Sequence, residues 1–138
     1  MVAWLSPWVY ETAMLHIALI FLGGGAGAAS RHLVNGAALR VLGPGFPAGT
    51  LVVNVVGSLL MGLFIGWVVK SGASTETRLL VATGFLGGFT TFSAFSLDVA
   101  NLWERGASGA AFGYIAASVL LSVGAVFAGL AIARAMGS

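Results

Sequence analysis

Residues 84–95 read GFLGGFTTFSAF, and this stretch decides how the rest of the chain is interpreted. It lies in the middle of a long apolar segment, yet it contains the glycine pair Gly87 and Gly88 and the threonine pair Thr90 and Thr91, which are poor helix formers. The pattern predicts a helix that is interrupted near its centre. A kink that serves only packing is the alternative interpretation.

The composition places this segment in a lipid bilayer. Charged residues make up 7% of the 138 positions and hydrophobic residues 59%, whereas ordinary soluble domains have about 25% and about 45–50%. A soluble domain with so few charges would expose large apolar patches, but lipid solvates such a surface. The sequence therefore predicts an all-α membrane protein, and it contains no basic run that would indicate nucleic-acid binding.

The length of the chain limits the number of membrane spans. At roughly 20 residues for each transmembrane helix, there is room for four spans and short connections. We therefore expect a single membrane domain over residues 1–138, with Ser74 or Thr75 as the N-cap of its third span. The expected spans are residues 12–34, 48–70, 76–103 and 109–134.

Tryptophans mark the ends of the predicted spans. Trp67 and Trp103 lie where an amphipathic ring suits the level of the lipid headgroups. Trp4 and Trp8 predict an interfacial segment at the N-terminus. The opening residues have no basic n-region, so a signal peptide is not expected.

Small residues recur at intervals of four along the spans. In lipid, helices associate through close approach of their backbones, so this spacing predicts tight helix–helix contacts and an oligomeric bundle. The pairs are Gly23 and Gly27, Ser58 and Gly62, Gly62 and Gly66, and Gly84 and Gly88.

The basic residues are divided evenly between the two expected faces of the membrane. Connections one and three would hold Arg31, Arg40 and Arg105, and the opposite face would hold Lys70, Arg78 and Arg134. The Lys/Arg imbalance that normally fixes orientation is therefore absent. In a chain of four spans, this tie predicts insertion in both orientations and an antiparallel homodimer.

Polar side chains form two stripes at intervals of four residues. Single Ser and Thr hydroxyls often bond only carbonyls of their own helix, but the amide of Asn54 should reach another helix or a solute. Because polar groups in membrane spans are costly, they usually mark a site. The stripes are Thr50, Asn54 and Ser58 in span two, and Tyr114, Ser118 and Ser122 in span four.

The interrupted third span offers groups of a different kind. Non-helical backbone at membrane depth is tolerated only where protein buries it or where it lines a wet cavity. Freed carbonyls there suit a cation, and freed N–H groups suit an anion. Phe92 and Phe95 also present ring edges of partial positive charge, with Ser93 and Ser96 nearby. We hypothesise that edges and neutral donors accept an anion without the full charge that would trap it.

Three other patterns do not indicate a site. Gly23, Gly25 and Ala28 fit G-x-G-x-x-A, but no strand is expected before them, so dinucleotide binding is not predicted. His16 and His32 have neither cysteine nor convergent carboxylates beside them for a metal. No nucleophile–base or paired-carboxylate arrangement stands out, so we do not expect an enzyme.

Three stretches together resemble the bacterial fluoride channel family, called Fluc or CrcB. They are GGGAGAASR ending at Arg31, PAGTLVVNVVGS around Asn54, and GFLGGFTTFSAF ending at Phe95. The third stretch is specific, and the resemblance covers nearly all of the chain after the first twenty residues. It implies a dual-topology homodimer with two antiparallel pores, through which fluoride leaves the cytoplasm passively across the bacterial inner membrane.

The resemblance also implies roles for single residues. The backbone carbonyls of Gly87 and Thr90, from both subunits, match positions that hold a structural sodium ion at the dimer interface. Ala94 stands where family members commonly carry Thr, so one hydroxyl of the polar lining is missing. The residues that match the fluoride pore or adjoin it are Arg31, Asn54, Thr91, Phe92, Ser93, Phe95, Tyr114, Ser118 and Ser122.

Two other functions fit parts of the sequence. A small multidrug-resistance type exporter of cationic compounds also has four spans and often dual topology, but proton coupling needs a carboxylate at mid-membrane. Glu11 and Asp98 are its candidates, and both lie towards span ends. A non-transporting assembly subunit would not explain Asn54 or the interrupted third span.

Overall fold

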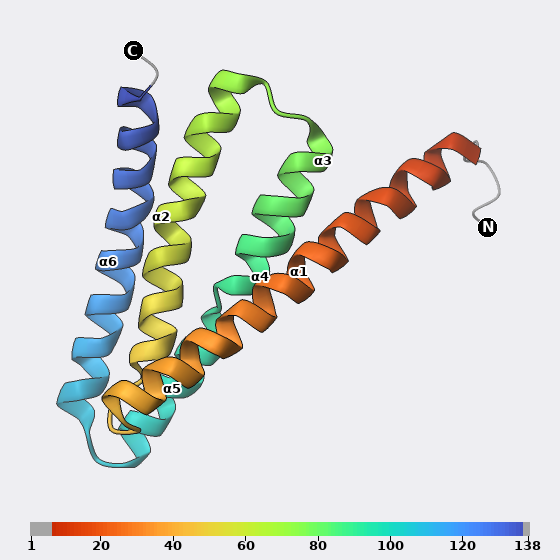
Figure 1. The fold of residues 1–138 in the computed structure, drawn as a ribbon. Helices are drawn as coiled ribbons and strands as arrows, with labels where there is room; N and C mark the ends of the chain where they lie inside the picture. The colour runs from red at the N-terminus through yellow and green to blue at the C-terminus, as the bar shows by residue number, and fades with distance from the viewer. Residues whose placement is uncertain (1–6, 137–138) are drawn as a thin grey trace.

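The structure is a computed structural model and describes residues 7–136. Within this range the chain forms helices joined by short connections (Figure 1). The third expected span is divided into four helical pieces, from α3 to α5. In chain order the elements are α1 (Pro7–Leu42), α2 (Ala48–Ser71), α3 (Thr75–Arg78), the π-helix η1 (Leu79–Leu86), α4 (Gly87–Phe89), α5 (Phe92–Glu104) and α6 (Ser108–Ala135).

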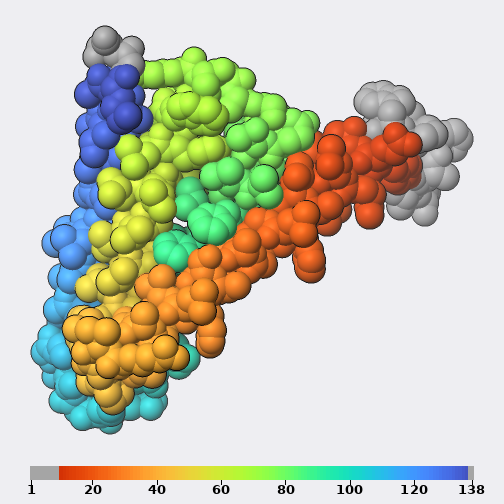
Figure 2. Space-filling view, viewed as in Figure 1, coloured from red at the N-terminus to blue at the C-terminus, as the bar shows by residue number. Residues whose placement is uncertain are grey.

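Helix α1 begins earlier and ends later than the expected span 12–34. The residues after Val34 were expected to form a connection, but they include Ala, Leu and Arg, which favour helix, and a single glycine does not end it. The helix stops before Gly43, whose φ of +76° favours glycine. At 36 residues it is about 54 Å long, well beyond the roughly 30 Å of a bilayer core. Figures 1 and 2 show it lying obliquely, with its N-terminal part away from the other helices.

Helices α2 and α6 form a parallel pair close to the expected limits of 48–70 and 109–134, and their C-terminal ends meet. A side chain on Gly62 would collide with the α6 backbone at Val126 and Gly129. At the end of the pair, the Lys70 ammonium donates to the carbonyls of Ala133 at 2.8 Å and Arg134 at 2.6 Å. It satisfies carbonyls that the end of α6 leaves without helical donors.

Helix α1 packs against η1 and α4 through glycines from both sides. A side chain on Gly27 would meet the backbone of Phe85, and one on Gly88 would meet the backbone of Gly24. The tight contacts predicted from the small-residue spacing are thus confirmed within the subunit.

The third span begins as predicted and breaks two residues after its glycine pair. Ser74 caps α3, because its hydroxyl accepts from the Thr77 N–H at 3.3 Å. Gly87 remains helical, with φ of −64° and ψ of −37°. The extended residues are Thr90, with φ of −81° and ψ of 158°, and Thr91, with φ of −155° and ψ of 122°. The threonines form the break, while Gly88 allows close approach to α1.

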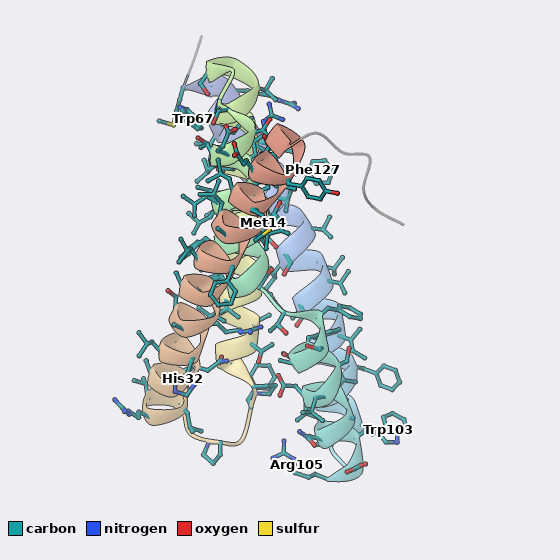
Figure 3. The ribbon with its side chains drawn as sticks, turned by 90° about the vertical axis from the view of Figure 1, so that its right-hand side faces the viewer. Met14, His32, Trp67, Trp103, Arg105 and Phe127 are labelled. Carbon is teal, nitrogen blue, oxygen red and sulfur yellow. The ribbon has the colours of Figure 1, made fainter. Side chains whose placement is uncertain are left out.

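The surface of the bundle is largely apolar. Among the described residues, four helical segments are long and apolar enough to cross a membrane: 10–42, 48–71, 75–104 and 108–135. Trp67 and Trp103 are about half exposed, at 50% and 57%, and lie at opposite ends of the bundle (Figure 3). Trp8 falls in the first turn of α1, whereas the expectation for Trp4 lies outside the described residues.

Candidate functional site

The break in the third span is held by Asn54 of α2. The Asn54 amide donates through Nδ2 to the Thr91 carbonyl at 3.0 Å, and its Oδ1 accepts from the Thr91 N–H at 2.7 Å. One side chain therefore pairs both backbone groups of an extended residue, as a neighbouring strand would. Of the two partners expected for Asn54, another helix or a solute, the structure shows the first.

The threonines of the break are bonded to their surroundings in different ways. The Thr91 hydroxyl caps α5 by accepting from the Ala94 N–H at 3.1 Å, and it lies 3.2 Å from the hydroxyl of Ser93. The Thr90 hydroxyl instead donates to the Leu86 carbonyl of the preceding turn at 3.0 Å. Both threonine side chains thus support the local backbone.

Arg31 does not lie in a connection, as the orientation count assumed. It lies within α1, and its Nη1 donates to the Thr90 carbonyl at 3.4 Å. The difference arises because α1 continues to Leu42, so that Arg31 falls beside the break.

A groove of about 350 Å³ lies between α2, the break and α6. Its lining brings together residues that were predicted as a site from three separate stretches of sequence. No Lys, Arg or His belongs to the lining within the described part of the chain. The predicted residues that line it are Asn54, Ser58, Thr90, Thr91, Phe92, Phe95, Ser118 and Ser122.

Two serine hydroxyls in this groove lack partners. The hydroxyl oxygens of Ser118 and Ser122 are buried and have no hydrogen-bond partner of good geometry among the described residues, and only the Tyr114 hydroxyl lies near that of Ser118. Other serines on the bundle behave as isolated hydroxyls usually do: Ser30 donates to the Ala26 carbonyl and Ser96 to the Phe92 carbonyl, both at 2.9 Å. Because a buried donor without a partner is costly, Ser118 and Ser122 indicate a solute or water in the groove.

The two phenylalanines lie together but differ in exposure. Phe92 is 77% exposed, whereas Phe95 is 8% exposed in the core cluster with Leu102 and Tyr114. Their ring centroids are 5.5 Å apart at an interplanar angle of 46°. The arrangement places one ring at the open side of the groove and the other at its inner wall.

Tyr114 does not line the groove with the two serines of its predicted stripe, although its hydroxyl interacts with that of Ser118 one turn later. Its ring packs against Phe95 and Phe46, and its hydroxyl donates to Oδ2 of Asp98 at 3.1 Å. Ser93 is also outside the groove lining, and it is exposed. The predicted polar line is therefore divided between the groove and the core beneath it.

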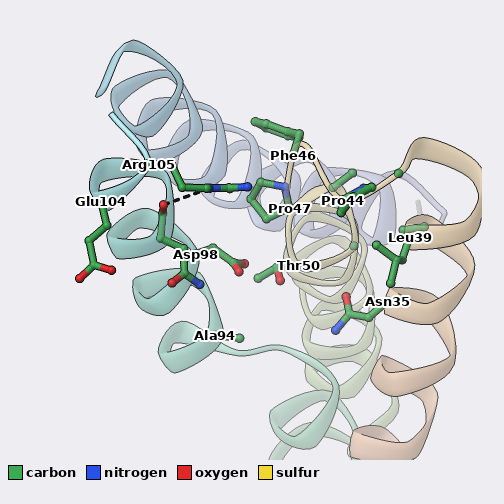
Figure 4. A pocket seen from close by; sticks show the side chains of 15 residues that line it. Asn35, Leu39, Pro44, Phe46, Pro47, Thr50, Ala94, Asp98, Glu104 and Arg105 are labelled. Carbon is green, nitrogen blue, oxygen red and sulfur yellow. Dashed lines mark hydrogen bonds between the residues drawn. The ribbon is translucent and has the colours of Figure 1, made fainter. Parts of the chain in front are cut away.

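A second cavity, of about 800 Å³, opens at the end of the bundle that holds the α1–α2 connection (Figure 4). Asn35, Thr50, Ala94 and Asp98 line it, with Arg105 at its edge, where Nε donates to the Asn101 carbonyl at 3.2 Å. Sequence reasoning set Asp98 aside because it lies towards a span end. The spacing i, i+4, i+7 from Thr91 through Phe95 to Asp98 was the signal that it shares their face of α5.

The carbonyls of Gly87 and Thr90 are suited to a cation in one respect that the structure shows. In a continuous helix each would accept from the N–H four residues later. Here the Thr91 N–H donates to Asn54, and the Ala94 N–H donates to the Thr91 hydroxyl. The long contact from Arg31 uses one acceptor position on the Thr90 oxygen, and a carbonyl has two.

Comparison with known proteins identifies the family. The profile described as "CrcB-like protein, Camphor Resistance (CrcB)" matches residues 18–130. The chain belongs to the CrcB family. Several CrcB relatives are named "Fluoride-specific ion channel FluC". One from Mesorhizobium japonicum is 56% identical over 123 residues, 89% of this chain and 99% of that protein. Those from Chelativorans sp. and Caulobacter vibrioides are 57% and 50% identical, over 89% and 88% of this chain and 99% and 97% of theirs.

Membership of the CrcB family confirms the resemblance seen in the three sequence stretches. Together with the four apolar helical segments in the described range, it makes the chain a multi-pass bacterial membrane protein. It also agrees with the expectation that the chain is not an enzyme, because the named relatives are channels.

Proposed function

We propose that this chain is a subunit of a fluoride channel, which lets fluoride leave the cytoplasm passively across the bacterial inner membrane. The observation that carries the proposal is the pair of unpartnered hydroxyls, Ser118 and Ser122, in a groove that also holds Phe92 and Phe95. The names of the CrcB relatives supply the identity of the anion. The chemistry of the groove supports a small anion that has shed water.

Neutral donors replace the water shell of the ion. The hydroxyls of Ser118 and Ser122 are free to donate, and the Asn54 amide has a second N–H beyond the one given to Thr91. Ring edges of Phe92 and Phe95 add weak positive potential. Conduction requires binding strong enough for entry and weak enough for exit, and a lining without full positive charge meets that need.

Two subunits arranged antiparallel would complete the pathway. Phe92 is 77% exposed beside a groove that is open on one side, which fits coverage by a second copy. With Arg31 inside α1, the remaining basic residues divide as Arg40 and Arg105 against Lys70, Arg78 and Arg134. Two against three is still a weak orientation signal. We therefore retain dual topology as part of the proposal.

The break is proposed to lie at mid-membrane, with a sodium ion beside it at the dimer interface. Thr90 is fifteen residues after Thr75 and fourteen before Glu104, the limits of the third apolar segment. Backbone carbonyls of Gly87 and Thr90 from both subunits would hold the ion, whose charge would join the two chains at their crossing. The diverted N–H donors of Thr91 and Ala94 support this assignment.

Fluoride efflux from liposomes containing the purified protein tests the proposal. A fluoride electrode should record rapid release when potassium fluoride is loaded inside and an ionophore balances charge, and chloride-loaded vesicles should remain tight. Release that requires a proton gradient, or release of a cationic dye, would instead favour the exporter. Vesicles that hold fluoride as protein-free ones do would overturn the proposed function.

A further inference from the structure

The two carbonyls proposed for sodium share one feature. Each has lost the N–H donor four residues ahead to a particular side chain. In a continuous helix the Thr91 N–H would donate to the Gly87 carbonyl, but here it donates to Oδ1 of Asn54 at 2.7 Å. Likewise, the Ala94 N–H would donate to the Thr90 carbonyl, but here it donates to Oγ1 of Thr91 at 3.1 Å.

These side-chain bonds have an alternative that would close the site. If Oδ1 of Asn54 were absent, the Thr91 N–H would need another acceptor, because an unpaired donor inside a membrane protein is costly. The nearest acceptor along the chain is the helical one, the Gly87 carbonyl. A continuous helix through Thr90 would then occupy both carbonyls with backbone donors. The side-chain acceptors thus compete directly with the helix.

We propose that Asn54 and Thr91 are positioning residues for the cation site, because their side-chain oxygens capture the N–H donors that would otherwise occupy the Gly87 and Thr90 carbonyls. The inference rests on the proposed sodium site. It gives Asn54 a second role, separate from donating to fluoride. Its Oδ1 accepts from the Thr91 N–H and holds the cation site open, while Nδ2 has a second N–H beyond the one that donates to the Thr91 carbonyl.

The two roles of Asn54 can be separated by substitution. Asn54→Leu removes both the acceptor and the donor at similar side-chain size. Asn54→Asp keeps the acceptor for the Thr91 N–H but places a carboxylate where the amide donated. Likewise, Thr91→Val removes the capping oxygen at nearly constant volume, and Thr91→Ser retains it. Ser122→Ala is the matched control, since this hydroxyl lines the groove and has no bond to the break.

The experiment measures the thermal stability of purified protein in detergent while sodium replaces N-methylglucamine at constant ionic strength. A ligand bound only by the folded protein raises the melting temperature with concentration, so the midpoint of that rise reports sodium affinity without any measurement of flux. For Asn54→Leu and Thr91→Val we expect the midpoint concentration to rise at least about tenfold. Asn54→Asp, Thr91→Ser and Ser122→Ala should not raise it, although Asn54→Asp should not conduct.

The possible outcomes separate the inference from the function on which it rests. If sodium does not stabilise the unaltered protein, the proposed sodium site is wrong. If sodium stabilises the unaltered protein and the Asn54→Leu protein with the same midpoint, the site stands and the positioning role is overturned. Should Asn54→Leu fail to fold, the pair Thr91→Val and Thr91→Ser decides the question, because equal midpoints in that pair would also overturn it.

Discussion

Two regions of the molecule differ in whether their polar groups have hydrogen-bond partners: the break at Thr90 and Thr91, and the serines of α6. At the break, where the backbone leaves the helix, Asn54 satisfies both backbone groups of Thr91, and the Thr91 hydroxyl caps the next helix. In α6 the helix is uninterrupted, yet the hydroxyls of Ser118 and Ser122 are left without partners. In the irregular region the polar groups of Thr91 are thus paired, whereas the regular helix leaves two hydroxyls unpaired.

The difference distinguishes groups that hold the shape of the groove from groups that are available to bind a ligand. A group that is already paired inside the protein holds geometry and has little capacity left for a ligand, whereas an unpaired buried donor gains a partner when a solute arrives. Asn54 and Thr91 therefore fix the wall of the groove, and the α6 serines provide unpaired hydrogen-bond donors for a solute. Phe92 and Phe95 lie between the two regions, directly after the break and facing the groove.

The largest expected effect follows from placing a charge at the junction of the two regions. Asn54→Asp should lower fluoride efflux from liposomes by about a thousandfold, because two like charges about 4 Å apart repel by about 4 kcal/mol at an effective dielectric constant of about 20. Ordinary efflux from this variant would show that Asn54 only packs. Size-exclusion chromatography of the same sample checks that assembly is retained.

The next effect tests the rings between the two regions. Phe92→Ile or Phe95→Ile should each lower efflux by at least about tenfold, since the aromatic edge is replaced by an aliphatic surface with no comparable positive potential. The oligomeric state on a sizing column should be unchanged. Undiminished flux in both variants would remove the ring edges from the pathway.

A smaller effect is expected on the α6 side of the comparison. Ser118→Ala and Ser122→Ala should each lower efflux about fivefold, the factor that corresponds to one neutral hydrogen bond of about 1 kcal/mol. Ser96→Ala, whose hydroxyl already donates to the Phe92 carbonyl, is the control and should conduct normally. Equal fluxes in all three variants would contradict the distinction between paired and unpaired hydroxyls.

The smallest effect is expected far from both regions. Glu11→Gln should leave efflux unchanged, because Glu11 is an exposed residue in the second turn of α1 and lines neither the groove nor the end cavity. The same liposome assay measures it. Loss of transport together with loss of proton dependence would point to the drug-exporter mechanism.

The spacing of polar residues predicted much of the site, but it did not predict which of them pair within the protein and which remain unpaired. The stripes at intervals of four identified Asn54, Ser118 and Ser122, and the weak helix formers identified an interrupted third span. Of the two pairs of poor helix formers that predicted the interruption, the glycines remain helical and the threonines form the break. Asp98 was set aside on its position in the span, although it bonds to Tyr114.

The sequence by itself determined the membrane environment, the helices and the family, because hydropathy and motifs are properties of short stretches of chain. It also determined which helix would be interrupted, since propensity is local. Only the tertiary structure decided where the break falls, that Asn54 meets Thr91 across 37 residues, and that Arg31 lies beside Thr90. Whether a buried polar atom has a partner depends on residues that are distant in sequence and are brought together by packing, and no local pattern records that.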